Sequence, residues 1–111
     1  MEGIYIAYVS GAEGYSAILF VLRNGRLTGA DIGGMKYVGE YEVSQNQIVG
    51  NLFAEVPANA GLISGFKNGD SPTKFNMPFS IEITEIGKGI IYLKSPFGDL
   101  TANISKIQEL P

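Results

Sequence analysis

The ionisable residues of this chain restrict the chemistry it can perform. It contains no histidine and no cysteine, which removes serine-histidine triads, the thiolate nucleophile, and imidazole and thiolate metal ligands. Asp31, Asp70 and Asp99 lack the spacing of a calcium-binding loop. Any catalysis would depend on carboxylates, lysine or tyrosine. We therefore predict that the protein is not an enzyme and uses no metal and no cofactor.

Three carboxylates, one pair and one single residue, are candidates for an acid/base site. Glu40 and Glu42 stand two residues apart, on one face of a predicted strand, and such a pair could serve acid/base chemistry. Carboxylates on a strand surface are usually only solvated, which is the interpretation we favour. Glu85 continues the inward register of Ile81 and Ile83, but a position at the strand end gives it access to water. We expect a structural role for Glu85 as well.

Composition indicates one acidic, globular domain. The chain has 111 residues, 45% of them hydrophobic, and a net charge of -3, which is enough for one packed core, so we expect a single domain over residues 1–111. The eight basic residues are spread singly, which disfavours nucleic acid and anionic membranes as partners. The longest apolar run, residues 17–22, is too short to cross a bilayer. We expect a cytoplasmic location.

Turn residues recur at the spacing typical of antiparallel barrels and sandwiches. Asn24-Gly25 is the strongest hairpin signal, because a type I′ turn needs positive φ at both central residues. Closure into an eight-stranded antiparallel up-and-down barrel would remove the exposed sheet edges, and a two-sheet sandwich is the alternative. The predicted strands cover residues 3–9, 15–23, 26–32, 35–44, 47–55, 77–86, 89–94 and 99–107.

A long connection, residues 56–76, separates the fifth and sixth predicted strands. We interpret it as a loop, with one short helical turn possible from Pro57. Connections of this length often form lids or binding segments. The predicted lid and the ligand cavity beneath it are formed by apolar side chains: Leu62, Ile63, Phe66, Phe79, Ile81 and Ile83.

The first two predicted strands are apolar on both faces. One face can fill the barrel, and the other would be exposed unless something covers it. The long loop or the C-terminal Ile107 and Leu110 could fold over it, or a second copy of the chain could pack there. For the homodimer, we predict an interface through Ile18, Phe20 and Leu22.

The N-terminal half resembles a known family, the GrlR-type negative regulators of type III secretion. The likeness covers roughly the first 50 residues and lies in the order and spacing of four motifs. These are Gly3-Ile4-Tyr5, Asn24-Gly25, Thr28-Gly29-Ala30-Asp31 and Tyr37-Val38-Gly39.

The resemblance implies a lipocalin-like eight-stranded barrel in the bacterial cytoplasm, a homodimer, and repression by sequestering a helix-turn-helix transcriptional activator without contacting DNA. In the family, an acidic run after the fourth strand contacts the partner. This chain has a polar turn at that place, preceded by two acidic residues. The partner-binding residues expected by this resemblance are Glu40, Glu42, Ser44, Gln45, Asn46 and Gln47.

Two functional hypotheses follow from the sequence. The first is a regulatory module that resembles GrlR and binds a protein partner. The alternative is a carrier or sensor of a small apolar ligand, because eight strands can enclose one such molecule.

Overall fold

A computed structural model describes residues 1–61, 67–95 and 98–111 of the chain. Its eight antiparallel strands form a nearly closed barrel, which confirms the predicted fold class over the alternative of a sandwich. The strands are β1 (Gly3–Gly11), β2 (Gly14–Arg23), β3 (Arg26–Asp31), β4 (Lys36–Ser44), β5 (Gln47–Val56), β6 (Thr73–Glu82), β7 (Ile91–Ser95) and β8 (Gly98–Gln108).

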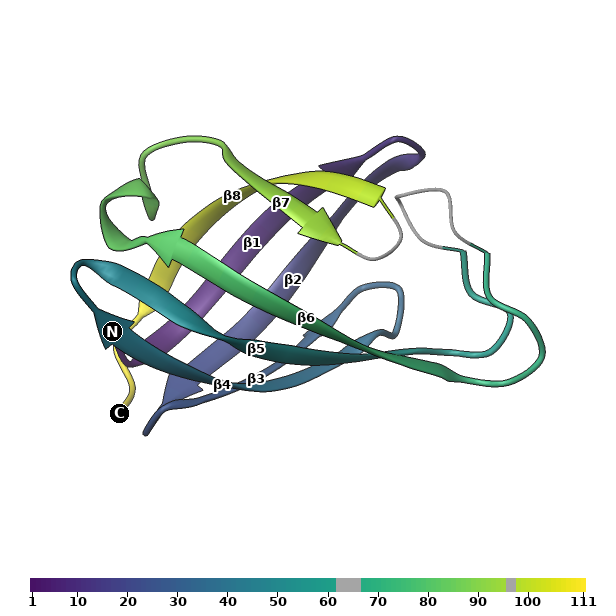
Figure 1. Ribbon diagram of the computed structural model, residues 1–111, viewed down its shortest axis with the longest axis horizontal. Helices are drawn as coiled ribbons and strands as arrows, with labels where there is room; N and C mark the ends of the chain where they lie inside the picture. The colour runs from purple at the N-terminus through teal and green to yellow at the C-terminus, as the bar shows by residue number, and fades with distance from the viewer. Residues whose placement is uncertain (62–66, 96–97) are drawn as a thin grey trace.

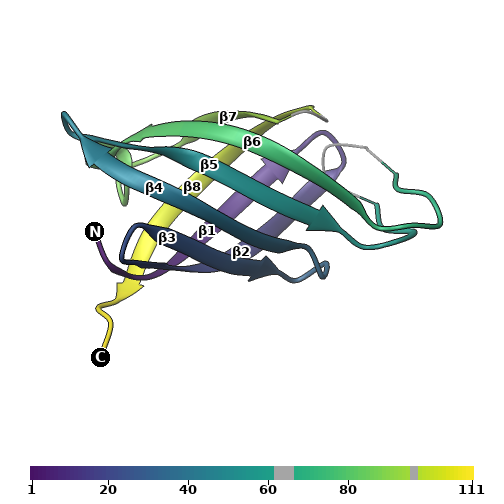
Figure 2. The ribbon, with the colours of Figure 1, turned by 60° about the horizontal axis from the view of Figure 1, so that its bottom comes forward.

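The strands follow one another around the barrel, and pairing of β1 with β8 joins the two ends of the chain. The order is β6-β5-β4-β3-β2-β1-β8-β7, so β6 and β7 border a seam across which no ladder forms between the described residues. Strands β4 to β6 cross in front of β1, β2 and β8 (Figure 1). A turned view places both termini at the same end of the barrel (Figure 2).

Two hairpins close through two-residue turns. Asn24 and Gly25 have φ values of 52° and 77°, and Gln45 and Asn46 have φ values of 51° and 66°. Positive φ at both central residues is the signature of the type I′ turn, whose twist matches that of the strands it joins. The prediction from Asn24-Gly25 is therefore confirmed.

Three inward-facing glycines allow neighbouring strands to approach closely. A Cβ at Gly39 of β4 would fall on the carbonyl oxygen of Asn51, and one at Gly50 of β5 would fall on that of Glu40. At Gly29 of β3, a Cβ would lie 2.8 Å from the carbonyl oxygen of Leu19. Glycine kinks of this kind give a sheet the curvature that a barrel requires.

The sixth strand differs from its predicted bounds. It begins at Thr73 and ends at Glu82, whereas the sequence indicated 77–86. Pro72 and the turn residues Asn68-Gly69-Asp70 favoured a loop, although every second side chain from Thr73 on faces the interior. Pro78 has no N–H to donate, which suits a strand beside the seam. Ile83–Glu85 form a 3₁₀ turn and Glu85 is exposed, so the predicted inward register of Glu85 is wrong.

The predicted helical turn at Pro57 is also wrong. The Ala60 N–H donates to the Pro57 carbonyl, 3.3 Å apart, and Asn59 has a φ of 63°. Positive φ at the third of the four residues is typical of a type II β-turn, and it stops helical propagation. Within the described ranges, no helix is long and apolar enough to span a bilayer.

Two groups of buried side chains make up the core. The larger fills the end of the barrel near the termini, where partly buried Ile83 and Ile86 pack against it. Its buried members are Tyr5, Ala7, Val9, Leu22, Tyr41, Ile48, Ile91, Ala102 and Ile104. The smaller group lies under β4 and β5 and consists of Met35, Tyr37, Ala54 and Val56. The interior between the two groups is not filled.

Candidate binding cavity

A cavity of about 460 Å³ occupies the barrel interior. Inward-facing side chains of all eight strands contribute to its wall, because alternate residues of each strand point to the same side. Most of these side chains are aliphatic or aromatic, and they include Phe20, Leu27, Leu52, Met77, Phe79 and Leu100. The wall is therefore suited to apolar molecules.

The cavity is not fully enclosed, and its wall reaches the end of the barrel opposite the termini, called the mouth below. The wall there includes Tyr15, Ile32 and Gly61, which come from β2 and from the β3–β4 and β5–β6 connections. Tyr15 is 84% exposed and Ile32 is 83% exposed, so large apolar side chains stand in water beside the opening. The opposite end is blocked by the larger core group.

Asp31 is the charged residue of the wall among the described residues. Its Oδ1 accepts hydrogen bonds from the backbone N–H groups of Gly33, at 2.9 Å, and Met35, at 3.0 Å. Its Oδ2 accepts one from the Tyr37 hydroxyl at 3.0 Å. These contacts fix the β3–β4 connection at the mouth, because the carboxylate substitutes for backbone partners that the turn lacks.

Two tyrosines have raised pKa values. Burial raises the pKa of Tyr37 far above its ordinary value, and the nearby charge of Asp31 and the hydrogen bond to it act in the same direction. Burial also raises the pKa of Tyr5, against the opposing effect of Lys106. Tyr5 stacks on Phe20 with ring centroids 5.4 Å apart, and its hydroxyl donates to the Met1 carbonyl at 2.7 Å. Both hydroxyls are neutral donors at pH 7.

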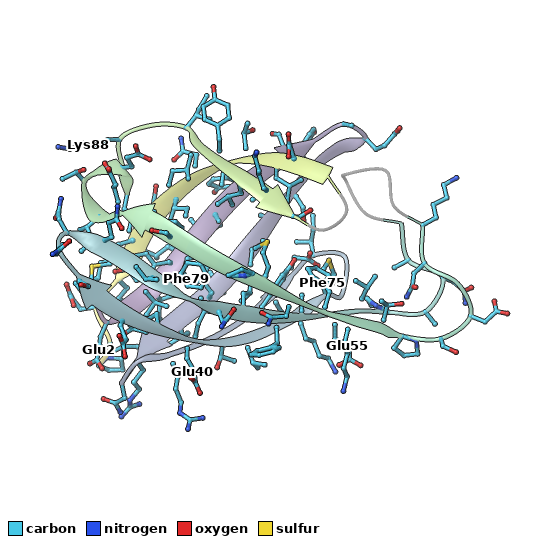
Figure 3. The ribbon with its side chains drawn as sticks, in the orientation of Figure 1. Glu2, Glu40, Glu55, Phe75, Phe79 and Lys88 are labelled. Carbon is cyan, nitrogen blue, oxygen red and sulfur yellow. The ribbon has the colours of Figure 1, made fainter. Side chains whose placement is uncertain are left out.

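The structure places two of the predicted cavity residues in the wall. Phe79 and Ile81 line the cavity from β6, and Figure 3 shows Phe79 on the side of β6 that faces the interior. Ile83 instead packs against the core at the blocked end, because the strand has already ended at Glu82. The predicted lid residues Leu62, Ile63 and Phe66 lie outside the described residues.

The predicted dimer-interface residues lie on the other face of β2. Ile18, Phe20 and Leu22 point inward and line the cavity, so they are unable to form an exterior interface. The outward face carries their neighbours Leu19, which is exposed, and Val21. Because both faces of β2 are apolar, alternation did not distinguish them.

The predicted partner-binding residues come together at the β4–β5 hairpin. Glu40, Glu42 and Ser44 are exposed on the outward face of β4, followed by the turn residues Gln45 and Asn46. The last of the six, Gln47, begins β5 and accepts a hydrogen bond from Ser80 at 3.1 Å. Glu40 points away from the barrel in Figure 3.

The pairing of Asp31 with Tyr37 was not predicted from the sequence, where Asp31 was rejected as a calcium ligand and otherwise appeared only in a motif of the family resemblance. Asp followed by Gly33-Gly34 is a signal for a turn in which the carboxylate accepts a backbone N–H two residues later. Within residues 1–61, 67–95 and 98–111, no three carboxylates gather as metal ligands would.

Comparison of the chain with family models, curated proteins and solved structures finds no match in any of the three. The barrel and its cavity are therefore the features that bear on function.

Proposed function

We propose that this protein binds a small apolar molecule inside its barrel without transforming it. The observation that carries the proposal is the cavity of about 460 Å³, with its largely apolar wall and an opening to solvent. Binding sites for small molecules usually have volumes of about 300–1,000 Å³ and apolar walls with few polar groups. The sequence favoured a regulatory module and gave an apolar-ligand carrier as the alternative. The cavity gives the carrier the stronger support.

The contacts of Asp31 favour binding over catalysis. A catalytic carboxylate needs an oxygen directed at the reacting group, whereas Asp31 already accepts hydrogen bonds from Gly33, Met35 and Tyr37. Glu40 and Glu42 are exposed on the outside of β4, away from the cavity. We therefore propose a non-enzymatic role.

The test is calorimetric titration with octanol, nonanol and decanol. Each added methylene that enters the cavity should improve the binding free energy by about 0.8 kcal/mol, which is about fourfold in Kd. An affinity that does not change along the series, or no binding at all, would contradict an apolar binding cavity.

Two variants on adjacent positions of β6 provide the matched control. Met77→Trp adds volume inside the cavity, whereas Asn76→Trp adds the same side chain on the exposed face. We expect Met77→Trp to lose most of the decanol affinity and Asn76→Trp to retain it. Thermal unfolding of both variants establishes that the loss does not come from unfolding.

A second candidate is the regulatory module that resembles GrlR, which would sequester a transcriptional activator in the cytoplasm as a homodimer. Two cross-strand pairs of apolar side chains on the outside of the barrel favour it. Leu19 pairs with Ile6 across β1 and β2, and Val38 pairs with Phe53 across β4 and β5. Leu19, Val38 and Phe53 are all exposed, as apolar residues at protein interfaces are in the free subunit.

Charge reversal on β4 tests this second candidate. The double variant Glu40→Lys, Glu42→Lys changes the exposed acidic positions of the proposed partner surface without touching the cavity. A protein captured from cell extract by the wild type and lost with this variant would support the regulator. Equal capture by both proteins, or no capture, would count against it.

A further inference from the structure

We infer that the cavity selects uncharged apolar molecules and discriminates against amphiphiles with a carboxylate head, and that Asp31 causes part of this discrimination. The inference rests on the proposed function, since it names the class of ligand that the same cavity accepts. It is carried by the charges of the cavity wall and by the position of Asp31 at the mouth.

The described part of the cavity wall offers no cation to an anionic head group. No lysine or arginine lines the cavity among the described residues, whose charged member is Asp31. The segments 62–66 and 96–97, read from the sequence, are Leu-Ile-Ser-Gly-Phe and Pro-Phe, which are uncharged. A carboxylate that entered head first would therefore lose its water without gaining a partner of opposite charge, and this is strongly unfavourable.

The opposite orientation places the head group at the mouth, beside Asp31. Backbone N–H groups of Gly33 and Met35 hold the Asp31 carboxylate in position at the cavity wall. A second carboxylate there would be repelled by the charge of Asp31, since like charges at short range disfavour each other. An alcohol of equal chain length carries no charge, so it avoids the repulsion and has a much smaller cost of losing water.

Lys67 is a basic residue near the cavity wall that could oppose this effect. It pairs with Gly61, a residue of the cavity wall, through an isolated β-bridge, and its side chain is exposed. An exposed lysine is strongly hydrated and screened by salt, so it contributes less than a fixed carboxylate at the wall. If Lys67 did capture anionic head groups, the carboxylate ligand would bind as tightly as the alcohol.

The test compares decanol with decanoate by calorimetry at pH 7, with decanol below its solubility limit in water and decanoate below its critical micelle concentration. We expect decanol to bind at least about tenfold tighter than decanoate. Equal affinities, or tighter binding of decanoate, would overturn the inference and leave the proposed binding function intact. Failure of both ligands to bind would remove the proposed function itself.

Asp31→Asn isolates the contribution of the charge. The amide keeps an oxygen that can accept from the backbone N–H groups of Gly33 and Met35, so the turn should persist. We expect decanoate to gain at least about threefold in affinity while decanol changes little. Glu82→Gln removes one negative charge from the exposed end of β6, outside the cavity wall, and should leave both affinities unchanged. An unchanged ratio in Asp31→Asn would overturn the role of Asp31.

Discussion

The hydroxyl of Tyr37 donates a 3.0 Å hydrogen bond to Oδ2 of Asp31. The contact ties β4 to the end of β3 at the cavity mouth, and Tyr37 belongs to the smaller core group. One tyrosine thus links the packing under β4 and β5 to Asp31 in the wall of the cavity.

Tyr37→Phe removes this hydrogen bond and retains the aromatic ring. We expect it to lower the free energy of unfolding by about 1–2 kcal/mol, because a partly buried carboxylate loses a donor. Urea unfolding measures the change. Tyr92→Phe removes an exposed hydroxyl on β7 and should stay within about 0.5 kcal/mol of the wild type. Equal stability of the two variants would show that the contact contributes nothing.

The raised pKa of Tyr37 predicts weakening of the fold at high pH. Its ordinary value is 10.0, so above about pH 10 the unfolded chain loses this proton while the folded protein keeps it. The contribution of Tyr37 to the free energy of unfolding is therefore fully present below that pH. Above it, this contribution falls by up to about 1.4 kcal/mol per pH unit for one such group. Tyr5, also with a raised pKa, acts in the same direction.

Urea unfolding between about pH 8 and pH 11 checks this prediction. The wild type should lose stability above pH 10, and Tyr37→Phe should lose less, since one of the responsible groups is gone. The same slope in both proteins would assign the alkaline effect to other residues.

Gly50→Ala tests the glycines that curve the sheet. The added methyl group would meet the Glu40 carbonyl across β4 and β5, so the strands must separate, at a cost of about 1–3 kcal/mol. Gly69→Ala provides the control, because a Cβ there meets nothing within 4 Å. Chemical unfolding should distinguish them clearly, and a Gly50→Ala protein as stable as the control would contradict the close approach.

Adjacent substitutions on β2 test which face is inside. Phe20→Glu places a charge in the cavity wall beside Tyr5, and we expect unfolding or a loss of more than about 3 kcal/mol. Leu19→Glu introduces the same side chain on the exposed face and should preserve the circular dichroism spectrum. A folded Phe20→Glu protein with an unfolded Leu19→Glu protein would reverse the assigned faces.

Much of the fold could be predicted because its signals are local. The hairpin at Asn24-Gly25 follows from two residues that tolerate positive φ. Phe79 and Ile81 were correctly assigned to the interior, since they alternate with the polar residues Ser80 and Glu82 at the end of β6. The β6 bounds could not be predicted, because a strand can extend into a polar segment when β5 supplies its hydrogen-bond partners.

The sequence by itself determined the β-sheet class, the hairpin order and the absence of histidine and cysteine chemistry. Those properties depend on residue type and on alternation along short segments. Only the tertiary structure decided which apolar face of β2 is inside, that Asp31 meets Tyr37, and that the barrel encloses a cavity. The physical reason is that a two-sided apolar strand satisfies alternation in either orientation. Side chains from distant strands decide which face of β2 turns inward. They also decide how much space is left inside the barrel once β1 pairs with β8.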